Sequence, residues 1–217
     1  MSDHCCSHGC SSNSAPAPRY RRALWVALFV NAAMFGVEIA GGMQSGSASL
    51  LADAVDFFGD AANYAVALAV LSMAPVWRSR AALLKGVCMG AFGCFVLARA
   101  AWSIAAGVAP EPVTMGAIGM LALCANLGVA ALLYAFRSGD ANMRSVWLCT
   151  RNDAIGNVAV MLAAAGVFGT GSGWPDWMVA GLMGTLALSA SFSVIRHARA
   201  ELDGGEAAIG AHAGHRH

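Results

Sequence analysis

Three aspartates lie close together in an apolar stretch, "SLLADAVDFFGDAANYAV" (residues 49–66). They are Asp53, Asp56 and Asp60. On a helix these positions fall within about 60° of one another, so they form one polar stripe along an apolar rod. Each ionisable side chain placed in the middle of a membrane costs roughly 2.5–3.5 kcal/mol. Interhelical hydrogen bonding could explain such a stripe, but Asn or Ser would serve that purpose without the charge. The three carboxylates therefore favour a cation site.

A second polar stripe lies in "WLCTRNDAIGN", where Cys149, Asp153 and Asn157 are spaced i, i+4, i+8. At 1.5 Å per residue, the pairs Asp56–Asp60 and Cys149–Asp153 both reach the middle third of a bilayer. If the two helices are neighbours, these four side chains meet there. We predict them as metal ligands, with a further set of residues in accessory or supporting positions: Asp53, Asn31, Asn157 and Asn126.

Three carboxylates and one thiolate suit a four-coordinate divalent transition metal. Oxygen ligands alone would favour Mg²⁺, Ca²⁺ or Mn²⁺, whereas the sulfur moves the preference towards Zn²⁺, Cd²⁺ or Co²⁺. An isolated cysteine is more often a small packing residue. The spacing between Cys149 and Asp153 is what favours a ligand.

The elements that must position these residues are long and apolar. The 217-residue chain is 58% hydrophobic and 12% charged, about half the charged fraction of a soluble domain. At about 20 residues per crossing, the apolar residues form six blocks, which are 23–42, 50–73, 81–107, 113–136, 146–168 and 174–195. We therefore predict an all-α polytopic membrane protein with six transmembrane helices.

The basic residues fall on alternate connections between these blocks. Arg19, Arg21 and Arg22 precede the first block, and Arg78, Arg80 and Lys85 are assigned to the connection between the second and third. The other set of connections contains no Lys or Arg. The positive-inside rule then places both termini in the cytoplasm, and we expect a bacterial inner membrane.

Two segments resemble the cation diffusion facilitator family. In "NAAMFGVEIAGGMQSGSASLLADAVDFFGDAANYAVAL" (31–68), Asn31, Glu38 and Ser49 precede the three aspartates in the family's order. "CTRNDAIGN" is similar to the family's pattern in the fifth span. The sequence differs from the family's common pattern at two ligand positions. Asp56 stands where many members have His, and Cys149 stands where many members have His or Asp.

The resemblance implies export of divalent metal from the cytoplasm in exchange for protons, usually by a homodimer. The chain ends where the family normally adds a cytoplasmic metal-sensing domain, so we expect any dimer to be held by the membrane helices. The expected organisation is a His/Cys-rich cytoplasmic tail (1–19), a transport domain (20–199) and a short C-terminal tail (200–217). Proton exchange also follows from the predicted site. Clustered carboxylates without metal repel one another and lose hydration, so some keep protons that an entering metal ion must displace.

The N-terminal "HCCSHGC" offers five more metal-binding side chains: His4, Cys5, Cys6, His8 and Cys10. Their spacing is too tight for a structural zinc site, so they indicate either a metal-loading tail or a bystander segment. Glu38 and Arg99, both near the outer ends of their blocks, could form an ion pair or flank the exit, and we favour the structural role.

The predicted function is proton-coupled efflux of divalent metal. Zn²⁺ is the expected ion, and Co²⁺, Cd²⁺ and Ni²⁺ are alternatives. The chain contains no glycine-rich phosphate-binding loop, and we expect neither an enzyme nor a prosthetic group nor a nucleic-acid partner. One rival function is proton-coupled export of organic cations, with Phe57, Phe58 and Tyr64 stacking on the substrate. A second rival is a membrane metal sensor or chaperone that binds metal without transporting it.

Overall fold

The computed structural model describes residues 18–69, 75–136 and 141–213, with side chains described over 18–69, 76–77, 79–136 and 153–203. These ranges hold six helices and no strand. The helices are α1 (Pro18–Ser45), α2 (Ala48–Ala69), α3 (Pro75–Ala106), α4 (Pro112–Tyr134), α5 (Ala141–Thr170) and α6 (Trp174–Ala213). Each predicted apolar block lies largely within one of them, so the all-α, six-helix fold is confirmed.

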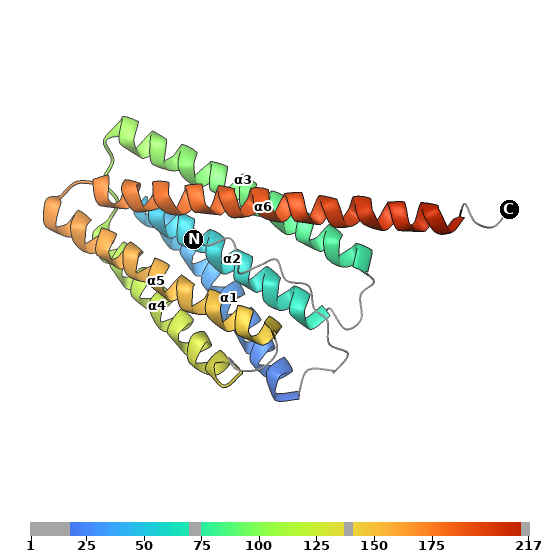
Figure 1. Cartoon of the computed structure of the whole chain (residues 1–217). Helices are drawn as coiled ribbons and strands as arrows, with labels where there is room; N and C mark the ends of the chain where they lie inside the picture. The colour runs from blue at the N-terminus through green and yellow to red at the C-terminus, as the bar shows by residue number, and fades with distance from the viewer. Residues whose placement is uncertain (1–17, 70–74, 137–140, 214–217) are drawn as a thin grey trace.

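The C-termini of α1, α3 and α5 lie at the same end of the bundle, and a short turn connects each of them to the next helix (Figure 1). The turns contain Gly46, Gly107 and Gly171, whose φ angles are 73°, 64° and 62°. A helix commonly ends on a residue in this left-handed conformation, which glycine adopts without a Cβ clash. Each glycine therefore lets one helix end and the chain turn back into the next helix.

Helix α2 is the central element, since it contacts each of the other five helices. Five described helices are long and apolar enough to cross a membrane, namely α1, α3, α4, α5 and α6. Helix α2 differs from them in composition because its 22 residues include three aspartates. Its central position explains how a helix with this composition can belong to the membrane bundle, because its neighbours separate its carboxylates from lipid.

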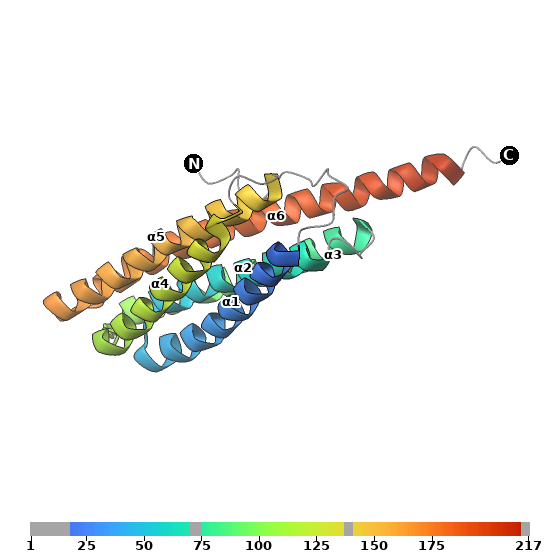
Figure 2. The same cartoon turned by 90° about the horizontal axis from the view of Figure 1, so that it is seen from below.

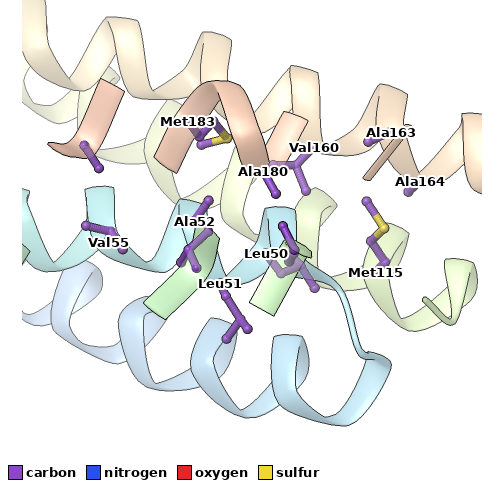
Figure 3. Packing of buried hydrophobic residues seen from close by; sticks show 14 of the residues in the cluster. Leu50, Leu51, Ala52, Val55, Met115, Val160, Ala163, Ala164, Ala180 and Met183 are labelled. Atoms are coloured by element: carbon purple, nitrogen blue, oxygen red, sulfur yellow. The ribbon is translucent and has the colours of Figure 1, made fainter. Parts of the chain in front are cut away.

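The main hydrophobic core surrounds the first half of α2. Leu50 and Val55 of α2 pack in one cluster with Met115 of α4, Val160 of α5 and Met183 of α6 (Figure 3). A second cluster, towards the other end of the bundle, joins α1, α2 and α4. Burial of apolar side chains on both sides of the aspartate stripe fixes the direction in which that stripe faces.

Helices α3 and α6 run side by side (Figures 1 and 2). Glycines of α3 allow this approach, because a Cβ at Gly86 would lie 2.8 Å from Ile195 Cγ1. The Ser191 hydroxyl of α6 also donates to the Gly86 carbonyl at 2.7 Å. Helix α6 has 40 residues and so extends roughly 60 Å, beyond the hydrocarbon thickness of a bilayer. Residues 200–213, expected as a tail, continue this helix.

The structure corrects one assignment made from the charge pattern. Arg78, Arg80 and Lys85 were placed in the connection between the second and third blocks. All three instead lie inside α3, which begins at Pro75. Lys85 already falls within the predicted apolar block 81–107, so its assignment to the connection followed the alternation of basic residues and not the extent of the helix.

Candidate metal site

The aspartate stripe of α2 lies in the interior of the bundle. Asp53 and Asp60 are buried and Asp56 is half-buried. The Tyr64 hydroxyl, one turn further along α2, donates to Asp60 Oδ2 at 3.1 Å. Burial of a carboxylate in an apolar bundle is unfavourable unless a proton or a cation offsets its charge. The stripe therefore supplies oxygen donors suited to a positively charged ligand.

Helices α2 and α5 contact each other, and they bring Asp60 and Asp153 together. The carboxyl groups of these two residues interact directly, and Asp56 lies within electrostatic reach of Asp153. The Oδ2 atom of Asp153 is buried and has no hydrogen-bond partner. Three of the four predicted ligands thus lie in one region, and one of their oxygens is left free to accept a cation.

The fourth predicted ligand, Cys149, lies on α5 one turn before Asp153. Its side chain is outside the described residues, so its role as a ligand stays a prediction. Among the side chains that are described, no group of three or more His, Cys, Asp or Glu residues is arranged to hold a metal ion. The pair Asp60–Asp153 would need further donors to complete four-coordinate binding, and Asp56 and Cys149 are the candidates.

A separate polar network holds Asp53. The Asn126 amide of α4 donates to Asn157 Oδ1 of α5 at 2.8 Å, and Asn157 Nδ2 in turn donates to Asp53 Oδ2 of α2. All three side chains are buried. The predicted supporting residues Asn126 and Asn157 therefore join three helices through Asp53, and their hydrogen bonds do not reach Asp60 or Asp153.

The predicted supporting residue Asn31 forms a hydrogen bond within its own helix. Its Nδ2 atom donates to the Ala27 carbonyl of its own helix at 2.8 Å, while its Oδ1 atom is buried without a hydrogen-bond partner. No described hydrogen bond joins it to the aspartates, and its supporting role stays a prediction.

Glu38 and Arg99 do not form the expected ion pair. Glu38 is fully buried, and neither of its carboxylate oxygens has a hydrogen-bond partner. Its carboxyl group instead lies beside Asp53, within electrostatic reach of Asp56. Arg99 Nε is likewise without a partner. Packing of α1 against α2 thus adds a carboxyl group to the Asp53 end of the stripe.

Sequence reasoning missed Asp176, which is fully buried in the first turn of α6. Its carboxylate accepts hydrogen bonds from Ser47 Oγ at 2.7 Å and from the backbone N–H groups of Ala48 at 2.9 Å and Ser49 at 3.0 Å. A residue of α6 therefore caps the N-terminus of α2. The only signal in the sequence is an acidic residue in a connection otherwise free of charge, which does not identify the helix it caps.

The N-terminal residues His4, Cys5, Cys6, His8 and Cys10 lie outside the described residues, and their proposed metal loading stays a prediction.

Comparison with known proteins adds an independent finding. Residues 24–202 match the family described as the cation efflux transmembrane domain. The metal cation efflux system protein CzcD of Cupriavidus metallidurans is 25% identical over 187 residues, which cover 81% of this chain and 59% of CzcD. The zinc transporter ZitB of Escherichia coli is 28% identical over 209 residues, which cover 90% of this chain and 67% of ZitB. The chain thus spans about three fifths to two thirds of the length of these relatives.

Proposed function

Because the chain belongs to the cation efflux transmembrane domain family, we propose that it exports a divalent transition metal ion from the cytoplasm in exchange for protons. The observation that carries this proposal is the direct interaction of Asp60 on α2 with Asp153 on α5. Zn²⁺ is the first candidate ion, since ZitB is named a zinc transporter and CzcD a metal cation efflux protein. Co²⁺, Cd²⁺ and Ni²⁺ are the alternatives that a mixed oxygen and sulfur ligand set accepts.

The chemistry of the site explains the exchange. Two adjacent carboxyl groups inside an apolar bundle are stabilised either by protons or by a divalent cation, and the two cannot occupy the same oxygens. Metal that enters from the cytoplasm displaces protons. When the same carboxyl groups face the other side, protons return and release the metal. Mutual exclusion at one site that alternates between two faces is sufficient for antiport.

The central position of α2 supports the same mechanism. It carries Asp56 and Asp60 and contacts every other helix, so a change in how α2 packs against α5 alters the distance between the ligands. The network of Asn126, Asn157 and Asp53 ties α2 to α4 and α5 on the side of the site nearer the start of α2. We infer that this network keeps the three helices together there while the ligand pairs separate or converge.

Transport in proteoliposomes tests the proposal. With the wild-type protein, Zn²⁺ added on the side equivalent to the cytoplasm should be taken up with movement of protons in the opposite direction. Asp60→Asn and Asp153→Asn should each abolish both signals, because each substitution removes an anionic ligand. Asp203→Asn is the matched control, since Asp203 is exposed on α6 far along the chain from both stripes. Undiminished Zn²⁺ uptake in both site variants would contradict the proposal.

The same assay separates the rival functions. Uptake of a quaternary amine without metal transport would favour an exporter of organic cations, and tight Zn²⁺ binding without flux would favour a sensor or chaperone. The tyrosine expected to stack on an organic cation uses its hydroxyl to donate to Asp60, and Phe58 packs against Phe35 and Phe92. These contacts favour the metal exporter. The homodimer and the cytoplasmic location of both termini stay predictions.

A further inference from the structure

Lys85 is the only lysine in the chain, and it lies beside the candidate metal site. It is half-buried in α3, facing α2. Its Nζ atom donates to Asn63 Oδ1 of α2 at 2.5 Å. Asn63 is three residues beyond Asp60, so it lies one helical turn from the ligand. The ammonium group also interacts electrostatically with Asp60.

Lys85 also packs against the turn of α2 that holds Asp60. A Cβ at Gly59, the residue before Asp60, would lie 4.0 Å from Lys85 Cε and 3.5 Å from Met89 Cε, which are ordinary contact distances, so both α3 side chains border this turn. A lysine in a membrane helix ordinarily extends towards the nearest water. Lys85 is instead directed at α2, next to the carboxylate that the mechanism requires.

We propose that Lys85 acts as an intramolecular substitute for the transported metal. In this role its ammonium group offsets the charge of Asp60 while no metal is bound, and it is displaced when the divalent ion arrives. The inference rests on the proposed function, because it assumes that Asp60 is a ligand. Lys85 is then a positioning residue, and its charge sets the affinity of the site for the metal ion. A positive charge held beside a ligand competes with the metal for the same carboxylate.

Removing that charge should therefore strengthen metal binding, which is the opposite of what a damaged structure would do. In detergent, Lys85→Gln should bind Zn²⁺ about tenfold more tightly than the wild type in calorimetric titration, a change typical of one neighbouring charge. Lys85→Arg retains the charge and should stay within about twofold of the wild type. Arg80→Gln is the matched control. Arg80 lies five residues earlier on the same helix, exposed and packed over the Trp77 ring at 5.2 Å, so its loss should leave affinity unchanged.

Chemical reactivity provides a second test on the wild-type protein, so the inference does not depend on a variant that folds. Because the chain contains one lysine, acetylation by acetic anhydride at this position can be followed by mass spectrometry of a single peptide. Saturating Zn²⁺ should raise the acetylation rate of Lys85 severalfold by displacing its amine from its position at Asn63, one turn from Asp60. Asp60→Asn should show the higher rate without Zn²⁺.

The two proposals fail in different ways. If the wild-type protein neither binds nor transports Zn²⁺ or the other candidate ions, the proposed function is wrong. If it binds metal but Lys85→Gln binds no more tightly, or if Lys85→Arg gains as much affinity as Lys85→Gln, the inference about Lys85 is wrong by itself. A Lys85 acetylation rate that Zn²⁺ leaves unchanged or lowers would also overturn it.

Discussion

Removal of the Asp176 carboxylate should destabilise the protein by withdrawing the cap of α2. Asp176 accepts three hydrogen bonds, two of them from the backbone N–H groups of Ala48 and Ser49. These groups belong to the first turn of α2, where no intrahelical acceptor is available. Each buried donor left without a partner costs about 1–3 kcal/mol. The two together would cost about 2–6 kcal/mol in Asp176→Ala.

The third hydrogen bond changes this figure little, because Ser47 Oγ keeps another role. It accepts from the Leu50 N–H at 3.1 Å and lies 3.3 Å from Ser49 Oγ. In Asp176→Asn one acceptor oxygen remains, so roughly half of the loss is expected. A capping carboxylate also interacts favourably with the positive end of the helix dipole, and the amide lacks this contribution.

Thermal unfolding of the purified protein in detergent, followed by tryptophan fluorescence, measures the effect. A loss of about 3 kcal/mol in Asp176→Ala corresponds to a fall in Tm of about 6–12 °C for a chain of this size. Asp176→Asn should fall between this variant and the wild type, and Asp203→Ala should unfold at the wild-type temperature. An unchanged Tm in Asp176→Ala would show that water or another group satisfies the start of α2, and would refute the capping argument.

Two further predictions concern how α2 and α3 are held. Asn157→Ala should lower the free energy of unfolding by about 2–4 kcal/mol, since it leaves Asp53 Oδ2 and Asn126 Nδ2 buried without partners. In chemical denaturation, the double variant with Asn126→Ala should lose less than the sum of the two single losses. Additive losses would argue against a shared network. Gly86→Val should lower the Tm by several degrees, because its Cβ would lie 2.8 Å from Ile195 Cγ1 and 3.4 Å from the Ile195 backbone nitrogen. The control Gly128→Ala should unfold like the wild type, because a Cβ at Gly128 would have no neighbouring atom within 4 Å. Equal Tm values for the two glycine variants would mean that moving α3 away from α6 does not lower the stability of the protein.

Several features of the site followed from sequence spacing alone. The i, i+4 pairs of α2 and α5 share a face in any helix, so their side chains were predicted to project in one direction before the neighbours of those helices were known. The contact between α2 and α5, and with it the meeting of Asp60 and Asp153, depends on tertiary packing. Whether Cys149 completes the site is still a prediction.

Other residues could not be placed from the sequence because their partners come from distant helices. Asp176 caps a helix that begins 128 residues earlier in the chain. Glu38 lies beside Asp53 where an ion pair with Arg99 was expected. Lys85 was read as a cytoplasmic loop charge, although it extends from α3 to Asn63 of α2. In each case the residue type was informative, but its partner was set by how the helices pack.

The sequence by itself determined six apolar helices and the helical faces that carry the carboxylates, because hydropathy and the 3.6-residue period are local properties of the chain. The tertiary structure alone decided that α2 lies at the centre, that Asp60 meets Asp153, and that Lys85 reaches Asn63, one turn from Asp60. Those outcomes depend on which helices come into contact, and the packing of small residues and buried polar groups between helices selects those contacts.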